Sequence, residues 1–275
     1  MVVCFDLENV ISCPRANISS FFYRRKLSVY NLTAHCSSNS SAYCAIWHEK
    51  LAGRGSNEIA SALIVILEKI VEEYNPKTIT LWSDSCVPQN RNSAIAFSLK
   101  DFLQKHQVDV IHQKYCEPGH SAIQEVDSIH SCIERRLSQQ ETFSPLGVMN
   151  CLKTCMRKPI TIIQMREGHF KNYLESSKLL HFKSVPFSKV KQISYRKDAT
   201  FEIEYKLSFE DGHTGNSCSI RSQSMKRRLS SPERWPAVKS INKKIELTHD
   251  KIKDLRAMLK FMTPKDKVFM SKLTE

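Results

Sequence analysis

The sequence has no long hydrophobic segment. Its longest apolar stretch, residues 60–67, contains Ser61 and is followed by Glu68, whereas a membrane-spanning helix needs about 20 apolar residues. The first residues also lack the basic leader and the small-residue cleavage site of a secretory signal peptide. We therefore expect an intracellular chain that has no membrane as a partner.

Metal-binding cysteine spacing is also missing. The ten cysteines are scattered along 275 residues, a length that can bury a core without disulfides. Cys151 and Cys155 are the closest pair, and no second Cys or His pair follows at the distance typical of a zinc finger. We expect reduced thiols and no structural zinc site. The sequence has no internal repeat.

Basic residues are unevenly distributed and are concentrated in the second half of the chain. The whole sequence has 41 Lys and Arg against 28 Asp and Glu, a net charge of +13. Residues 1–150 hold 14 basic and 15 acidic side chains, which leaves 27 and 13 of these totals in residues 151–275. A positive field of this size favours a polyanionic partner such as nucleic acid, and it belongs to the second half.

The first 140 residues alternate between strand and helix patterns, in the order β-β-β-α-β-α-β-α. This order predicts an α/β fold with a mixed five-stranded sheet flanked by helices. Strands are predicted over residues 2–7, 27–36, 42–48, 77–83 and 108–114, and helices over residues 56–73, 92–105 and 124–137.

Beyond residue 150 the pattern becomes basic and less regular. It predicts strands over 159–165 and within 190–209, a short helix over 170–176 and a polar loop over 208–235. It also predicts a longer helix over 247–261. We divide the chain into a core (1–145), a basic α+β extension of the core (146–207), a flexible linker or loop (208–240) and a C-terminal helical segment (241–275).

Carboxylates lie at the ends of two of the apolar strands. Asp6 follows Val-Val-Cys-Phe, and Asp84 follows a strand that ends in Trp-Ser. Glu58 lies in the first turn of the first long helix, and Asp127 lies near the start of the third. Acids that converge from separate elements repel one another unless a cation neutralises them. Mg²⁺ or Mn²⁺, which prefer oxygen ligands, are the natural candidates.

This arrangement of acids resembles the ribonuclease H fold. The stretch Asn-Glu-Ile-Ala-Ser-Ala-Leu at residues 57–63 resembles the first helix of that fold, and Gly119-His120-Ser121 followed by Glu125-Val126-Asp127 resembles its Gly-His loop and last helix. The resemblance implies that Asp6, Glu58, Asp84 and Asp127 are the acids that bind metal. It also implies that His120 is the loop histidine, which acts in product release.

Further stretches are similar to the catalytic core of DDE-type transposases from eukaryotic DNA transposons. They are residues 53–61, residues 82–86 with 89–92, and residues 118–121 with Asp127, His130, Ile133 and Glu134; residues 247–273 resemble the C-terminal end of such proteins. The sequence starts almost at the first catalytic strand, so the resemblance implies an N-terminally truncated transposase core.

The resemblance implies two-metal phosphoryl transfer on nucleic acid, by cleavage or strand transfer. Asp6 would bridge two Mg²⁺ or Mn²⁺ ions, Asp84 would bind one, and either Asp127 or Glu134 would bind the other. DNA is favoured over RNA, and homo-oligomerisation is left open. The alternatives are a nucleic-acid-binding or protein-interaction domain that has lost catalysis, and the inert product of a decayed element.

Several polar residues are candidates for binding the nucleic acid. Gln89, Asn90 and Arg91 either contact phosphate or cap a helix. A second candidate is a basic stripe that would bind phosphates and consists of Lys183, Lys189, Lys191, Arg196 and Lys197. The alternative is that these side chains form a solvated surface. The basic segment Lys226-Arg227-Arg228 is typical of a nuclear localisation signal or of a kinase site that would modify Ser230. From the first alternative we expect a nuclear protein. We interpret Trp47 and Trp82 as core side chains rather than base-stacking platforms.

Overall fold

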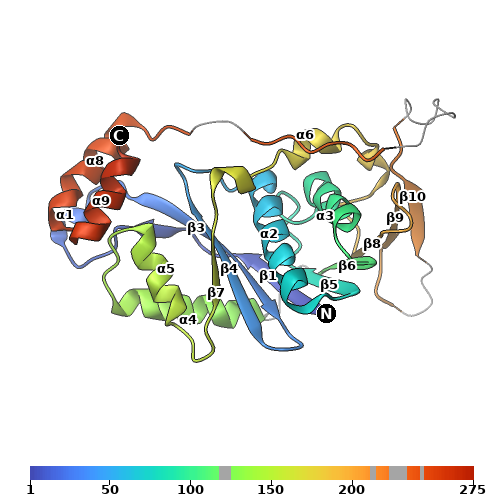
Figure 1. The fold of residues 1–275 in the computed structure, drawn as a ribbon, viewed down its shortest axis with the longest axis horizontal. Helices are drawn as coiled ribbons and strands as arrows, with labels where there is room; N and C mark the ends of the chain where they lie inside the picture. The colour runs from blue at the N-terminus through green and yellow to red at the C-terminus, as the bar shows by residue number, and fades with distance from the viewer. Residues whose placement is uncertain (118–124, 211–214, 223–233, 242–244) are drawn as a thin grey trace.

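The computed structural model describes residues 1–117, 125–210, 215–222, 234–241 and 245–275 (Figure 1). The strands are β1 (Val2–Leu7), β2 (Ile11–Cys13), β3 (Leu27–Cys36), β4 (Ser41–His48), β5 (Thr78–Ser83), β6 (Val110–Tyr115), β7 (Thr161–Gln164), β8 (Gln192–Arg196), β9 (Glu202–Lys206) and β10 (Asn216–Ser219). The helices are α1 (Ser19–Phe22), α2 (Ser56–Tyr74), α3 (Ser93–Lys105), α4 (Glu125–Gln139), α5 (Pro145–Lys153), α6 (Tyr173–Ser177), α8 (His249–Met258) and α9 (Pro264–Leu273).

One mixed sheet runs through the molecule. Within the described residues it has ten strands, nine of them in the order β10-β9-β8-β6-β5-β1-β3-β4-β7, with β2 paired to β3. β1 is parallel to β5 and antiparallel to β3. The protein is therefore α/β, with a mixed sheet flanked by helices. The five predicted strands are present as β1, β3, β4, β5 and β6. The sheet is larger than predicted because β7 extends one end, beside β4, and β8 to β10 extend the other, beside β6.

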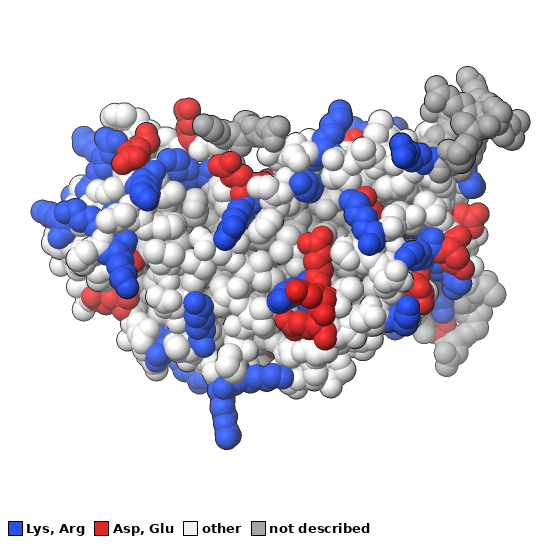
Figure 2. All heavy atoms as spheres, in the orientation of Figure 1, with Lys and Arg blue, Asp and Glu red and all other residues white. Residues whose placement is uncertain are grey.

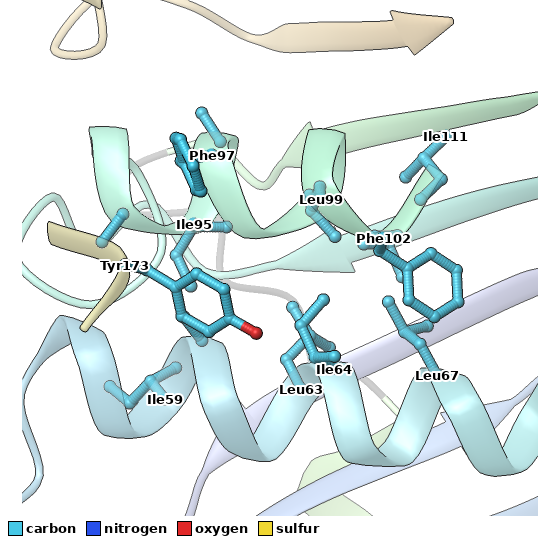
Figure 3. Packing of buried hydrophobic residues seen from close by; sticks show 14 of the residues in the cluster. Ile59, Leu63, Ile64, Leu67, Ile95, Phe97, Leu99, Phe102, Ile111 and Tyr173 are labelled. Carbon is cyan, nitrogen blue, oxygen red and sulfur yellow. The ribbon is translucent and has the colours of Figure 1, made fainter. Parts of the chain in front are cut away.

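Helices α2 and α3 cover one face of the sheet. Ile59, Leu63 and Leu67 recur at helical spacing along α2 and are fully buried. Figure 3 shows these side chains directed at α3, which contributes Ile95 and Phe102 to the same cluster. This apolar stripe fixes α2 against the sheet.

Helices α4 and α5 cover part of the opposite face. Val3 and Phe5 of β1 belong to the cluster under α2 and α3, so strand alternation directs Asp6 to the other side. There, Ile129 and Ile133 of α4 are buried in a second apolar cluster with residues of β3 and β4. In Figure 1, α4 and α5 lie beneath the β1, β3 and β4 part of the sheet, and none of the described helices lies beneath β5, β6 or β8.

The C-terminal helices α8 and α9 pack against α1 and the start of β3. Phe21 and Leu27 form a third buried cluster with Leu255 and Met270. Figure 1 shows these segments, which are far apart in the sequence, together at one end of the molecule. Lysine and arginine side chains are numerous at this end and scattered over the rest of the visible face (Figure 2).

The second half of the chain has more regular structure among the described residues than the sequence predicts. The predicted linker, residues 208–240, includes β10, which pairs with β9. It also includes Trp235, whose ring centroid lies 4.9 Å from that of Phe97. β2, α1, α5 and α9 were not predicted. Among the described residues, no helix combines the length and the apolarity that crossing a membrane requires.

Candidate functional site

Two of the predicted acids meet where β1 and β5 end. These strands are parallel neighbours, and Cys4 lies opposite Trp82 in their register. Asp6 and Asp84 each come two residues further along, on the same face of the sheet because side chains alternate. The pairing of β1 with β5 therefore brings the two strand-end acids to one place.

Helix α4 adds a carboxylate and an imidazole to this place. Asp127 and His130 are three residues apart and so lie on the same side of the helix. A carboxylate oxygen of Asp6, a carboxylate oxygen of Asp127 and a ring nitrogen of His130 all lie within 4.8 Å of one another. We call Asp6, Asp84, Asp127 and His130 the acidic cluster.

The electrostatics of the acidic cluster favour a cation. Burial raises the pKa of Asp6, and the charges of Asp84 and Asp127 raise it further, from 3.8 to about 7. Burial lowers the pKa of His130, and among the described residues its Nε2 atom is buried without a hydrogen-bond partner. Crowded carboxylates beside an uncharged imidazole are a donor set that a divalent cation would stabilise.

The loop after β5 fixes the orientation of Asp84. Its Oδ1 atom accepts a hydrogen bond from the backbone N–H of Cys86 at 3.2 Å and another from the side-chain amide of Asn90. Asn90 is only 2% exposed, and its backbone carbonyl oxygen accepts a hydrogen bond from the Gln113 side chain at 2.9 Å. Asn90 therefore connects Asp84 to the core.

Glu8 and Glu134 are not part of the acidic cluster, but they lie close enough for their charges to interact. Glu134, seven residues after Asp127, forms an ion pair with Arg15 at 3.3 Å. Glu8 is 4% exposed and accepts a hydrogen bond from the Asn31 side chain at 2.7 Å. Burial, followed by the charge of Glu134, raises the pKa of Glu8 to about 8 despite this bond. Of the two candidates for the third acid, Asp127 is the one placed beside Asp6.

Glu58 does not join the acidic cluster within the described residues. Its Oε2 atom accepts a hydrogen bond from the backbone N–H of Gly55 at 3.0 Å, so the carboxylate caps α2. This bond satisfies a backbone donor at the start of the helix. His120 lies outside the described residues.

The predicted phosphate-binding loop is largely inside the protein. Arg91 is 5% exposed; its guanidinium donates to the backbone oxygen of Val190 at 2.8 Å and lies over the ring of Tyr115. Asn90 is equally buried, and Gln89 is partly exposed. The assignment of Asn90 and Arg91 to phosphate binding is therefore corrected. The alternative of a helix cap holds for Asn92, whose side chain accepts from two backbone N–H groups of α3.

The predicted basic stripe lies near the surface, and most of its members have partners. Lys191 forms an ion pair with Glu117, and Arg196 forms one with Asp198 at 3.0 Å. Lys197 donates to the backbone oxygen of His106 at 2.7 Å. The remaining two members, Lys183 and Lys189, are exposed.

Two residues near the site were predicted only in part. His130 was named within a motif, without a role, and Glu8 was placed on the face of Asp6, either as a bystander or as a residue that supports the metal ligands. The spacing Asp-x-x-His on a helix was the available signal for His130. For Glu8, alternation on β1 indicates the same face as Asp6, but its burial depends on tertiary packing.

The fold and the site define an α/β protein with acidic side chains gathered on one face of a mixed sheet. Residues 26–210, more than half of the chain, match the family described as a domain of unknown function (DUF7869), and the protein belongs to this family. Asp84, Asp127 and His130 lie within the matched range, and Asp6 precedes it. No curated protein matches the sequence, and no solved structure matches it.

Proposed function

We propose that this protein is a metal-dependent phosphoryl-transfer enzyme that cleaves or joins nucleic acid strands, with a transposase-like core. The observation that carries the proposal is the convergence of Asp6, Asp84 and Asp127. Burial, followed by the charges of Asp84 and Asp127, raises the pKa of Asp6 to about 7. Clustered, buried carboxylates lower the stability of the folded state, and such clusters are typical of sites that bind a cation.

The order of the elements supports a ribonuclease H-like core. When β2 and α1 are set aside, the described elements from β1 to α4 follow the expected order β-β-β-α-β-α-β-α. Asp6 is the next-to-last residue of β1, Asp84 follows β5, and Asp127 lies in the first turn of α4, as the resemblance to ribonuclease H implies. Glu58 departs from this pattern because it caps α2.

The donor set fits a divalent metal ion. Asp6 and Asp127 offer hard oxygen ligands, which Mg²⁺ and Mn²⁺ both accept, and His130 offers a buried nitrogen that suits Mn²⁺ better than Mg²⁺. When bound, such ions activate the attacking water or hydroxyl and stabilise the leaving oxygen. The protein's own part is to orient the ligands: Asn90 and the Cys86 N–H hold Asp84, and burial lowers the pKa of His130, which favours the neutral imidazole that can bind a metal.

Cleavage assays test the proposal. Labelled single-stranded and double-stranded DNA and RNA are incubated with Mg²⁺ or Mn²⁺ and either the wild type or Asp84→Asn. The amide keeps the size of the side chain and an oxygen that can accept from Cys86 and Asn90. We expect cleavage by the wild type, more with Mn²⁺, and loss of cleavage in the variant.

Asp109→Asn is the matched control, because Asp109 is exposed and immediately precedes β6, at the opposite end of that strand from Asp84. Cleavage that is equal in Asp84→Asn and the wild type would contradict the role of the acidic cluster. Binding without cleavage by the wild type would favour the alternative of a nucleic-acid-binding domain. We also propose a nuclear location on the basis of Lys226-Arg227-Arg228, which lies outside the described residues; a fluorescent fusion tests it.

A further inference from the structure

A row of side chains crosses the sheet next to the acidic cluster. Trp82 of β5 lies opposite Lys114 of β6, Lys114 lies opposite Gln192 of β8, and Gln192 lies opposite Lys206 of β9. Trp82 precedes Asp84 by two residues, so alternation directs the whole row to the face on which the cluster lies. We call these four residues the Trp82 row. They occupy the part of this face that none of the described helices covers (Figure 1).

The Trp82 row combines aromatic surface with positive charge. The ammonium group of Lys114 lies 5.3 Å from the ring centroid of Trp82. The ring centroid of Phe209, in the segment that follows β9, lies 5.9 Å from that of Trp82. Phe209 is 41% exposed and Lys206 is exposed. Trp82 is itself only partly buried, so the interpretation of this side chain as core is corrected, whereas Trp47 is 2% exposed. Rings beside ammonium groups are the combination that stacks on bases and contacts phosphates.

The Trp82 row lies beside the site where chemistry is proposed. Cys4 and Trp82 face each other in the register of β1 and β5, and Asp6 and Asp84 each lie two residues beyond. Two residues of a strand span roughly 6.6 Å. A strand of nucleic acid held along the row would therefore pass next to the acidic cluster.

The charges on both sides of the row favour one strand over a duplex. On the side away from the acidic cluster, His112 of β6 pairs with Ser194 of β8, and Ser194 pairs with Glu204 of β9. Glu204 is exposed, so its carboxylate repels a second phosphate backbone. The cluster repels phosphate on the other side of the row unless a cation is bound. The attractive strip is thus confined to a single row of side chains.

We propose that the Trp82 row, together with Phe209, binds single-stranded nucleic acid and guides it to the acidic cluster. Phosphates would contact Lys114 and Lys206, and a base would stack on the exposed ring of Phe209. The inference deepens the proposed function and rests on it for the role of the cluster. The binding itself requires no metal, so it can be measured separately from catalysis.

Fluorescence anisotropy in a chelator tests this inference with labelled single strands and with duplexes of the same sequence. Phe209→Ala should weaken single-strand binding at least about fivefold through lost stacking. Lys206→Ala should weaken it and reduce the slope of log affinity against log salt by about 0.7, the effect of one phosphate contact. We expect the wild type to bind single strands more tightly than duplexes.

Matched controls come from the opposite end of the molecule. Phe22→Ala removes an aromatic ring that is 82% exposed, and Lys253→Ala removes an exposed cation of α8. Both should bind as the wild type does. Wild-type affinity in Phe209→Ala and Lys206→Ala, or tighter binding of duplex than of single strand, would overturn the inference. Intact single-strand binding without cleavage would instead overturn the proposed catalysis alone.

Discussion

Replacing Asp6 by asparagine should stabilise the metal-free protein. The pKa of Asp6 is raised from 3.8 to about 7, chiefly by burial and then by Asp84 and Asp127. A shift of about three pKa units at about 1.36 kcal/mol each corresponds to a cost on the order of 4 kcal/mol when the carboxylate is ionised. Asparagine cannot ionise, so Asp6→Asn avoids this cost.

The sign of the pH dependence follows from the direction of the shift. Because the folded protein holds the Asp6 proton more tightly than the unfolded chain, wild-type stability falls as pH rises from about 4 to about 7. The stability advantage of Asp6→Asn should therefore be near zero at about pH 4 and reach its full size above about pH 7.

Urea unfolding in a chelator across this pH range measures the effect, with Asp109→Asn as the control for loss of an exposed carboxylate. Added Mn²⁺ should then stabilise the wild type more than Asp6→Asn. A difference in unfolding free energy that does not change with pH, or a variant less stable than the wild type at pH above about 7, would refute the electrostatic reasoning.

Three further predictions concern stability away from the cluster. Asn92→Ala removes the cap of α3 and should cost about 1 kcal/mol in urea unfolding; an unchanged midpoint would contradict the cap. Leu255→Ala opens the cluster that joins α8 to α1 and should cost about 2–5 kcal/mol; if these helices did not pack together, thermal unfolding would be unaffected. Burial lowers the pKa of Lys100 from 10.5 to about 8. The folded state binds this proton less tightly, so from about pH 8 to about pH 10.5 wild-type stability should rise relative to Lys100→Met by about 3 kcal/mol, and a constant difference would count against it.

Sequence periodicity was sufficient for the central elements. Strands β1 and β3 and helix α2 have the apolar patterns of buried elements, and their bounds were predicted to within one residue. Short elements such as β2 and α1 have three or four residues, too few for a periodic signal to emerge. Strand β10, Asn216–Ser219, contains polar residues and owes its place to pairing with β9.

The site was predictable where strand ends alone position a side chain. Asp6 and Asp84 follow this rule, because the carboxyl ends of parallel neighbours meet at one edge. Glu58 was predicted to join the cluster but does not, because its carboxylate instead accepts a local hydrogen bond from the backbone N–H of Gly55. The prediction that Arg91 binds phosphate was wrong because its guanidinium contacts a backbone carbonyl and an aromatic ring inside the protein. These partners offset the cost of burying the charge. They come from distant parts of the chain, so no local sequence pattern indicates them.

The two ends of the sheet bear on how copies of the protein can associate. The outermost strands, β7 and β10, each have four residues. Short edge strands expose few unpaired backbone groups and so resist pairing with a neighbouring molecule. We therefore expect any self-association to use side-chain surfaces and not to form a continuous intermolecular sheet. Self-association of this kind would leave the Trp82 row accessible in each copy.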